Sequence, residues 1–388
     1  MKLITQPLND MMISWRHDLH QNPELGFQET RTAKTVANLL KSFGLKVYEE
    51  FGKTGVLGLL ERDRTKKTIA IRADMDALPI RESSNLKYKS KNDGVMHACG
   101  HDGHTAILLG AAKYLSSNTE FSGNVIFIFQ ANEENGLGAK AMIDDGLFDR
   151  FEIEQIYALH NLPNMPAGYF ATRENTITAS ESSFEITINT KGGHSALPNM
   201  GGDAILLASS IVTTIQSIVS RKIDPQKNAV ISVTEFLTNG STNVLASRVT
   251  LKGDIRTLND DVRHLIKKEL NEIATGICLS NNVKHEFKFD TKFPITKNAS
   301  HPTQNIISSV SDMVGKERID GTCTPMLFSE DFSFFTSKKP GCFVLIGNGT
   351  DGANAQPLHS SNFDFNDEIL CLGSSLWVEL AHNAFRTK

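Results

Sequence analysis

The 388-residue sequence lacks an excess of either charge: 40 lysine and arginine residues stand against 44 aspartate and glutamate residues, a formal net charge of −4. A nucleic-acid-binding protein needs a basic surface, so we expect no nucleic-acid partner. Long apolar runs are lacking too. No segment approaches the ~20 apolar residues of a membrane span, and Asn9 and Asp10 interrupt the stretch where a signal peptide would be apolar. We therefore predict a cytoplasmic protein with no membrane partner.

Cysteine is scarce. The five cysteines are scattered and include no Cys-x-x-Cys pair, which argues against a disulfide framework or a structural zinc ribbon. Four of them lie in apolar or mixed surroundings, as small buried side chains do. Cys99 is the exception, because it lies in MHACGHDGHT, residues 96–105, together with three histidines and an aspartate.

The remaining composition is that of a globular protein, and the chain is long enough for two domains. Short apolar runs, such as TIAIRADMD (68–76) and NVIFIFQANEEN (124–135), alternate with helical patterns such as residues 105–117. Strands that are apolar on both faces and alternate with helices predict an α/β fold with a mainly parallel sheet.

The middle of the chain has a different rhythm. Its apolar patterns follow the order β-α-β-β-α-β, which is that of a ferredoxin-like domain, and the α/β pattern returns after Pro294. We therefore predict one domain of residues 1–180 and 293–388, interrupted by a smaller domain of residues 181–292.

Metal-capable side chains follow several of the predicted strands. They are Asp74, Asp76, Glu133, Glu134, His160 and His359. Because the carboxyl ends of strands in open α/β sheets line the ligand crevice, we expect these side chains at one place. If residues 96–105 are extended, His97, Cys99 and His101 point to the same side.

Five of these residues are candidate metal ligands: Cys99, His101, Glu134, His160 and His359. A catalytic zinc ion keeps about three protein ligands and an open position, so five candidates exceed one site. If one ligand bridges, each of two metals receives three, and paired metals recur in hydrolysis. A thiolate has the lone pairs to bridge, and we assign Cys99 as the bridge. The donor set suits two divalent ions of zinc, manganese, cobalt or nickel.

The adjacent Glu133 and Glu134 are candidates for two different roles in hydrolysis. One binds metal, and the other takes a proton from the attacking water and passes it to the leaving group, which makes hydrolysis the implied reaction. The alternative is a solvated pair of turn acids. Asp76 is a candidate to orient a ligand histidine.

The smaller domain contributes three further candidates. His194 follows two glycines in TKGGHSALPN, where a surface histidine without function is the alternative. Asn243 and Arg256 are candidates to clamp a substrate carboxylate, which arginine can bind through two parallel hydrogen bonds.

Six motifs carry a resemblance to a known family: LHQNPELGFQE (19–29), IRADMDALPI (71–80), MHACGHDGHT, FQANEENG, KGGHSALP and SEDFSFF (329–335). From end to end the chain resembles the N-acyl amino acid amidohydrolases of the metallo-aminoacylase and carboxypeptidase superfamily. The stretches LKYKSKNDGVMHACGHDGHT and QSIVSRKIDPQ look most like the bacterial hippurate hydrolases.

The resemblance implies a di-metal peptidase-like domain with an inserted lid and dimerisation domain, and hence a homodimer or higher homo-oligomer. It implies that Cys99 bridges two metals, one completed by Glu134 and His359. His101 and His160 would complete the other.

The resemblance also implies catalytic and binding roles. Glu133 would be the general base, His194 would stabilise the oxyanion, and Asn243 and Arg256 would hold the substrate carboxylate. The chain departs from the family at Ala131-Asn132, where Pro-Ala is usual, and at Ser182, where an acid is common. We expect these two departures to affect the choice of acyl group rather than the reaction.

The leading functional prediction is metal-dependent hydrolysis of the amide bond of N-acyl-L-amino acids, of the hippurate (N-benzoylglycine) or N-acetyl type, to a carboxylic acid and a free amino acid. A metallo-dipeptidase or carboxypeptidase is a neighbouring alternative, because the same attack cleaves a peptide bond. A metal-keeping binding protein without turnover is the alternative from another class. Glu133 argues against it, because a general base serves no purpose in a pure binder.

Overall fold

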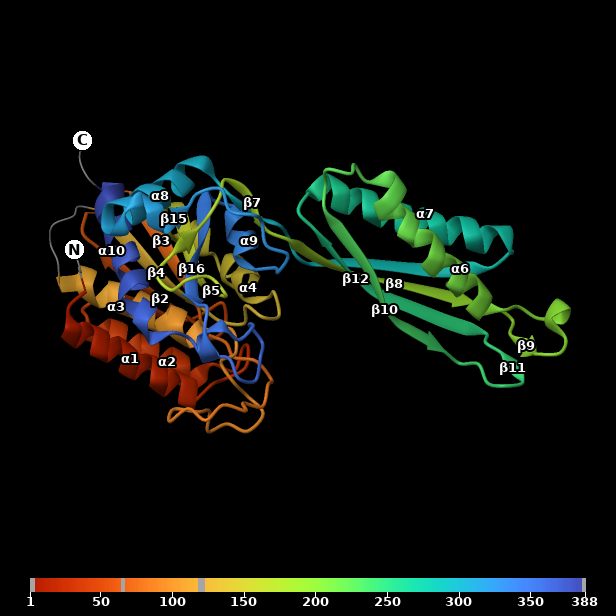
Figure 1. The fold of residues 1–388 in the computed structure, drawn as a ribbon, viewed down its shortest axis with the longest axis horizontal. Coiled ribbons are helices and arrows are strands. Elements are labelled where there is room, and N and C mark those ends of the chain that lie inside the picture. Colours follow the sequence, from red (N-terminus) through yellow and green to blue (C-terminus); the bar gives the residue numbers. More distant parts are fainter. Residues whose placement is uncertain (1–3, 64–66, 118–122, 386–388) are drawn as a thin grey trace. The chain divides into compact units, whose positions relative to one another are not determined.

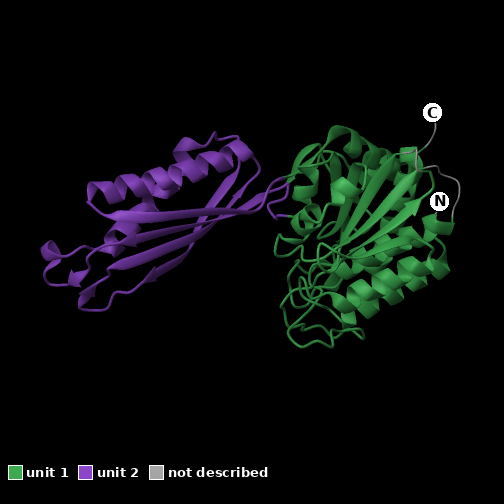
Figure 2. Cartoon of the chain, turned by 180° about the vertical axis from the view of Figure 1, so that it is seen from behind, with its two compact units in different colours: residues 1–177, 296–324, 330–388 green, residues 178–295, 325–329 purple. Residues whose placement is uncertain are grey.

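The computed structural model of the protein describes residues 4–63, 67–117 and 123–385. The chain divides into two compact units (Figure 2). Unit 1 comprises residues 1–177, 296–324 and 330–388, and unit 2 comprises residues 178–295 and 325–329. The segment predicted as an inserted domain, residues 181–292, lies within unit 2. The short return segment at residues 325–329 has no sequence signal that we recognised.

Unit 1 is built on an eight-stranded sheet with the order β1-β2-β4-β3-β5-β16-β6-β15 (Figure 1). The strands are β1 (Lys46–Phe51), β2 (Gly55–Glu61), β3 (Thr68–Asp74), β4 (Asn124–Gln130), β5 (Ile153–Pro163), β6 (Phe170–Ala171), β15 (Ile319–Asp320) and β16 (Gly341–Gly349). The central strands β4, β3, β5 and β16 run parallel, whereas β1 and β2 are antiparallel to their neighbours. The predicted α/β fold is confirmed.

Burial on both faces explains the continuous apolar runs of the central strands. Every residue of β3, β4 and β16 is buried. The helices of unit 1 are α1 (Gln6–Gln21), α2 (Thr30–Ser42), α3 (His101–Ser117), α4 (Gly138–Asp144), α5 (Leu147–Arg150), α8 (Ser300–Val314), α9 (Phe332–Thr336) and α10 (Leu370–Phe385). Helix α3 packs against β3, α1 and α10 and is buried over most of its length. A short ribbon of β7 (Asn175–Thr178) and β14 (Thr296–Asn298) completes the strands outside unit 2.

Unit 2 is a four-stranded antiparallel sheet with two helices (Figure 1). Its main elements in chain order are β8 (Ser180–Asn189), α6 (Ala204–Ser217), β10 (Ala229–Thr238), β12 (Arg248–Thr257), α7 (Asp260–Ser280) and β13 (Lys284–Phe293). This is the β-α-β-β-α-β order expected from the sequence. The spatial order β10-β12-β8-β13 leaves β10 at one edge. A small ribbon of β9 (Gly193–His194) and β11 (Val244–Leu245) was not predicted, because two-residue strands carry no periodicity.

One helix corrects an expectation about apolar length. Among the described residues, Ala204–Lys222 is long and apolar enough to cross a membrane by length and composition, which is weak support for a span. Leu207, Ile211 and Ile215 are buried in the core of unit 2. Ile205 and Leu206 are exposed on the same helix. The helix is therefore apolar on two sides, one of which has no partner within unit 2.

Candidate metal centre

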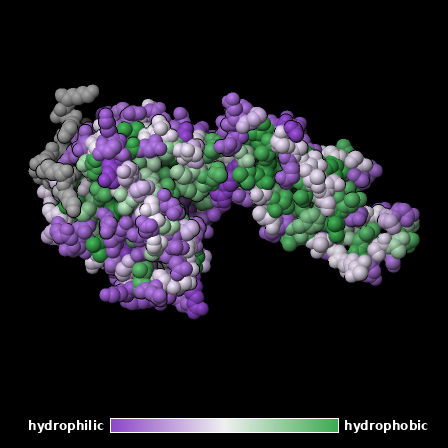
Figure 3. Space-filling model, in the orientation of Figure 1, coloured by the Kyte–Doolittle hydropathy of each residue, from purple (hydrophilic) through white to green (hydrophobic). Residues whose placement is uncertain are grey.

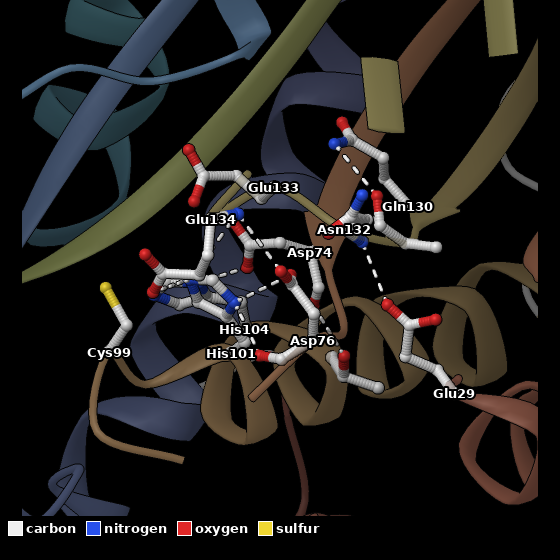
Figure 4. Close-up of polar contacts among 12 residues, drawn as sticks. Glu29, Asp74, Asp76, Cys99, His101, His104, Gln130, Asn132, Glu133 and Glu134 are labelled. Carbon is white, nitrogen blue, oxygen red and sulfur yellow. Dashed lines mark hydrogen bonds and ion pairs between the residues drawn. The ribbon is translucent and has the colours of Figure 1, made fainter. Parts of the chain in front are cut away.

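The site forms where the parallel strands of unit 1 end. Asp74 closes β3, Glu133 and Glu134 follow β4, and His160 lies near the end of β5. The loop after β16 brings in His359, whose backbone N–H donates to the carbonyl oxygen of Ala98 at 2.8 Å. Residues from five separate parts of the chain thus converge, as strand ends in a parallel sheet predict. Figure 4 shows the side chains around Glu133 and Glu134.

Cys99 belongs to two groups of three metal-capable side chains whose ligand atoms lie within 4.8 Å of one another. One group contains His101 and His160, and the other contains Glu134 and His359. The Cys99 Sγ lies 3.4 Å from His160 Nε2, and Glu134 Oε1 lies 3.3 Å from His359 Nε2. Two triads that share one thiol are the arrangement a bridging cysteine would produce.

Hydrogen bonds at the far ring nitrogens orient two of the imidazoles. His101 Nδ1 donates to the Asp76 carbonyl oxygen at 2.9 Å and lies 3.2 Å from Asp76 Oδ1. His160 Nδ1 donates to the Asn161 carbonyl oxygen at 2.7 Å. In each ring Nε2 is thereby left as the acceptor, and metal-binding histidines are held in this way. The buried Nε2 of His101 makes no hydrogen bond within the described residues, so it fits a metal ligand.

The electrostatics of the centre favour a bound cation. Burial raises the pKa of the Cys99 thiol well above its ordinary value, and the nearby Glu134 and Glu133 raise it further. Burial lowers the pKa of His160, which keeps that ring neutral and able to bind metal. Burial alone would lower the pKa of His101, but Asp74 and Asp76 raise it to about 10. Buried thiol, imidazole and carboxylate donors gathered at one place are a donor set that fits a divalent transition metal.

Glu133 stands apart from the two triads. Burial raises its pKa well above the ordinary value, and repulsion from Glu330, Glu134 and Asp331 raises it further. The Asp331 N–H donates to Glu133 Oε1 at 3.3 Å. Glu133 also groups with His101 and Glu134, and separately with Glu330 and Asp331. A carboxyl group that holds protons unusually well beside candidate metal ligands is suited to proton transfer.

Asp76 lies between two of the predicted ligands. Besides its contact with His101, its Oδ2 accepts the backbone N–H of Glu134 at 3.0 Å. Its position fits the predicted orienting role, because one side chain contacts both His101 and the Glu134 backbone.

The expectation that residues 96–105 are extended needs correction. Helix α3 begins at His101, so the extended alternation that would group His97 with Cys99 and His101 ends there. His97 is buried and joins none of the metal-capable groups of the described residues. His104 instead lies close, because its Nδ1 donates to Asp74 Oδ1 at 2.6 Å in a group that includes His101.

The sequence reasoning missed Arg72, which is fully buried in β3. Its guanidinium contacts Asp74 at 2.8 Å, Glu330 at 2.9 Å and Asp331 at 3.0 Å. It therefore ties the acids of SEDFSFF to the end of β3. The available signal was a single arginine within an otherwise apolar strand pattern.

The three remaining candidates lie in unit 2. His194 and Asn243 are close, since β9 pairs with β11 and the Ser195 N–H donates to the Asn243 carbonyl oxygen at 3.1 Å. Arg256 is at the opposite end of β12, where it pairs with Glu181 at 2.8 Å and Asp254 at 2.9 Å. Asn243 precedes β12, and Arg256 lies near the end of that strand. At ~3.3 Å per residue, the strand separates the two residues by roughly 20 Å or more. The structure therefore does not bring Asn243 and Arg256 together within one chain.

Comparison with known proteins identifies the family of the chain. Residues 70–383 match Peptidase family M20/M25/M40. The chain is 40% identical to a hippurate hydrolase of Campylobacter jejuni, covering 94% of both chains. It is 38% identical to thermostable carboxypeptidase 2 of Saccharolobus solfataricus, covering 96% of this chain and 95% of the other.

A solved structure resembles the whole chain. It is described as a dinuclear metal binding peptidase from the M20 family of Bacillus subtilis, with 30% identity and a TM-score of 0.87 over 99% of this chain and 100% of the other. The chain therefore belongs to Peptidase family M20/M25/M40, and it is a metal-dependent amidohydrolase of that family.

Proposed function

We propose that the protein hydrolyses the amide bond of N-acyl-L-amino acids, with hippurate and N-acetyl amino acids as the substrates to test first. The observation that carries the proposal is the pair of triads sharing Cys99 beside the buried Glu133. The similarity to a hippurate hydrolase over almost the whole chain supports this choice of substrate.

We assign the metal ligands as the two triads suggest. Cys99, His101 and His160 would hold one divalent ion, and Cys99, Glu134 and His359 would hold the other. Such ions polarise a carbonyl group and lower the pKa of water. Zinc, manganese, cobalt and nickel all suit a mixed thiolate, imidazole and carboxylate site.

Glu133 is the general base of the proposal. Its carboxylate accepts a proton from the attacking water and transfers that proton to the leaving amide nitrogen. Its buried position beside His101 and Glu134 places Glu133 to hold the proton between these two steps. The Asp76 side chain orients His101 and the Glu134 backbone.

His194 is suited to stabilise the oxyanion. Its Nδ1 accepts the Ala196 backbone N–H at 3.1 Å, so in a neutral ring the proton resides on Nε2, where it can be donated to a substrate oxygen. Asn243 lies beside it. The separation from Arg256 then suggests that these residues reach one substrate from different chains: His194 and Asn243 from one subunit, and Arg256 from its partner.

A second copy of the chain fits the exposed apolar surface of unit 2. Leu206 on α6 is 63% exposed, and Val230, Phe236 and Leu237 are exposed on the edge strand β10. Hydrophobic residues gather on the visible face of this unit in Figure 3. An unpaired strand edge beside an apolar helix is suited to pairing with a copy of itself about a twofold axis. We propose a homodimer, with higher homo-oligomers built on it. A cytoplasmic location and the absence of nucleic-acid and membrane partners stay predictions from composition.

A carboxypeptidase activity is the second candidate, favoured by the 38% identity to thermostable carboxypeptidase 2. The two activities differ in what lies on the acyl side of the bond, an amino acid residue or a simple acyl group. A dipeptide with a free amino terminus needs an acidic partner in the pocket, and the sequence shows no carboxylate clearly suited to that task.

The test is turnover of a substrate panel by metal-free protein reloaded with zinc, manganese, cobalt or nickel. The panel comprises N-benzoyl, N-acetyl and longer aliphatic acyl amino acids, together with dipeptides and N-blocked peptides. We expect at least one ion to support hydrolysis of N-acyl amino acids in preference to dipeptides. Preferred cleavage of peptides would favour the carboxypeptidase. Tight metal binding without any turnover would favour the binding protein.

A further inference from the structure

A left-handed residue opens the turn that carries Glu133 and Glu134. Asn132 has a φ of 53°, a region that asparagine tolerates better than most side chains. The Gly138 N–H donates to the Asn132 carbonyl oxygen at 3.1 Å, and the Gly136 N–H donates to that of Glu133 at 2.7 Å. The conformation of Asn132 therefore sets the direction in which Glu133 and Glu134 leave β4.

The side chain of Glu29 holds Asn132 in place (Figure 4). The Asn132 backbone N–H donates to Glu29 Oε1 at 2.9 Å, and Thr54 Oγ1 donates to Glu29 Oε2 at 2.6 Å. Glu29 occupies the N-cap of α2, where a carboxylate commonly accepts from its own helix, yet it makes no such bond. Its carboxylate is directed to the active-site turn instead.

Glu29 is a carboxylate buried at a cost in folding free energy, which argues for a role beyond packing. Glu29 is fully buried and has no cationic partner among the described residues, and an unpaired buried carboxylate is costly. Gly26, in the same loop, packs directly against the Asn132 side chain, because a Cβ at Gly26 would lie 1.8 Å from Asn132 Oδ1. The motif at residues 19–29 therefore contacts both the backbone and the side chain of Asn132. Because Asn132 is only 2% exposed, it is suited to setting backbone geometry rather than acyl preference.

We propose that Glu29 is a positioning residue for Glu133. It acts through the Asn132 backbone, and what matters is the reach of its hydrogen-bonding oxygen rather than its charge. The inference rests on the proposed role of Glu133 as general base. A displacement of about 1 Å at a reacting group can lower a rate by about 10²-fold. A residue that does not touch the substrate, such as Glu29, can therefore control kcat by fixing the position of Glu133.

Two substitutions distinguish the length of the Glu29 side chain from its charge. Glu29→Gln keeps the length of the side chain: its Oε1 can accept the Asn132 N–H, and its amide can donate to Thr54. Glu29→Asp keeps the charge but is one methylene shorter. We expect Glu29→Gln to retain kcat, and Glu29→Asp to lower kcat by on the order of 10²-fold with KM and metal content unchanged.

A second measurement is independent of activity. Hydrogen exchange of the peptide that spans residues 131–136 reports on the Asn132 amide in the metal-loaded enzyme. We expect faster exchange in Glu29→Asp and wild-type protection in Glu29→Gln. Thr54→Val is the matched control: it removes the other contact of Glu29 but leaves the Asn132 contact, so its kcat should fall much less than that of Glu29→Asp.

The role of Glu29 is overturned by any of three results: unchanged kcat and protection in Glu29→Asp, an equal fall of kcat in Glu29→Gln, or loss of metal in Glu29→Asp. In a Glu133→Gln background, Glu29→Asp should have little further effect, because both act on one group. If Glu133→Gln itself has normal turnover, the proposed function of Glu133 fails. Normal kcat in Glu29→Asp beside an impaired Glu133→Gln refutes only the inference about Glu29.

Discussion

The backbone N–H of His359 donates to the carbonyl oxygen of Ala98 at 2.8 Å. This hydrogen bond joins two parts of the chain that are distant in sequence, next to Cys99. The triads are therefore assembled by the fold, and removal of one ligand should alter metal binding more than folding.

Cys99→Ala tests the shared ligand. Because Cys99 belongs to both triads, its loss should reduce metal content at both positions and abolish turnover, while circular dichroism and thermal unfolding show a folded protein. Elemental analysis measures the metal. Two ions per chain still bound in the variant, with normal turnover, would refute the bridging role.

Glu133→Gln tests the base. Glutamine keeps the shape of Glu133 but cannot accept the proton, so turnover should fall by about 10²–10⁴ while metal binding persists. Kinetics and elemental analysis on the same preparations measure both. If the metal is lost instead, Glu133 and Glu134 exchange roles.

His20 should make stability depend on pH. Burial alone would lower its pKa, but hydrogen bonds with Asp102 and Glu82 raise it from 6.5 to about 9. Protonated His20 therefore stabilises the fold fully below pH 6.5, and this contribution is lost as the pH rises through 9. The difference corresponds to about 3 kcal/mol.

Urea unfolding of wild-type protein and His20→Gln at several pH values between 6 and 9.5 measures this effect. The stability difference between the two proteins should shrink as the pH rises. His264→Gln, a substitution of an exposed histidine on α7, is the control and should follow the wild type. Parallel curves for His20→Gln and wild type would contradict the expectation.

The sequence predicts the parts of the site that depend on strand ends. Asp74, the glutamate pair and His160 follow apolar runs, and the parallel sheet brings such positions together. It did not predict contacts set by side-chain length across the core. Arg72 reaches Glu330, 258 residues away, and His20 reaches Asp102, 82 residues away, and no local pattern encodes these pairs.

The parts of the fold that the sequence predicted are those with a regular pattern of apolar residues. Long elements such as α7 have a clear period, whereas the β9–β11 ribbon depends on pairing between Gly193–His194 and Val244–Leu245, which are far apart in sequence. The separation of Asn243 from Arg256 follows from the length of β12, which begins after Asn243 and reaches Arg256 near its end.

Leu206→Glu tests the proposed dimer. A charge on the exposed apolar side of α6 should weaken association by about 2 kcal/mol or more, since it would be buried without a partner. Light scattering coupled to size exclusion measures the mass. Leu279→Glu is the control, because Leu279 is 72% exposed at the end of α7. An unchanged mass for Leu206→Glu would place the contact elsewhere.

His194→Ala tests the oxyanion role. When water adds to the amide, negative charge develops on the former carbonyl oxygen, and one donor to such an oxygen contributes about 2.7–4 kcal/mol in comparable sites. The maximal rate should therefore fall by about 10²–10³, with a much smaller change in KM, because the contact forms mainly in the transition state. An unchanged maximal rate would return His194 to the exposed polar surface.

Mixing His194→Ala with Glu133→Gln shows which chain supplies His194. If it acts across the dimer, each mixed dimer contains one complete site, with Glu133 from the first variant and His194 from the second. Equal mixing with full subunit exchange should then restore about one quarter of wild-type activity. If His194 serves the Glu133 of its own chain, every site in the mixture lacks one of the two groups. Activity would then stay at the level of the separate variants, and the transfer of His194 across the dimer would be refuted.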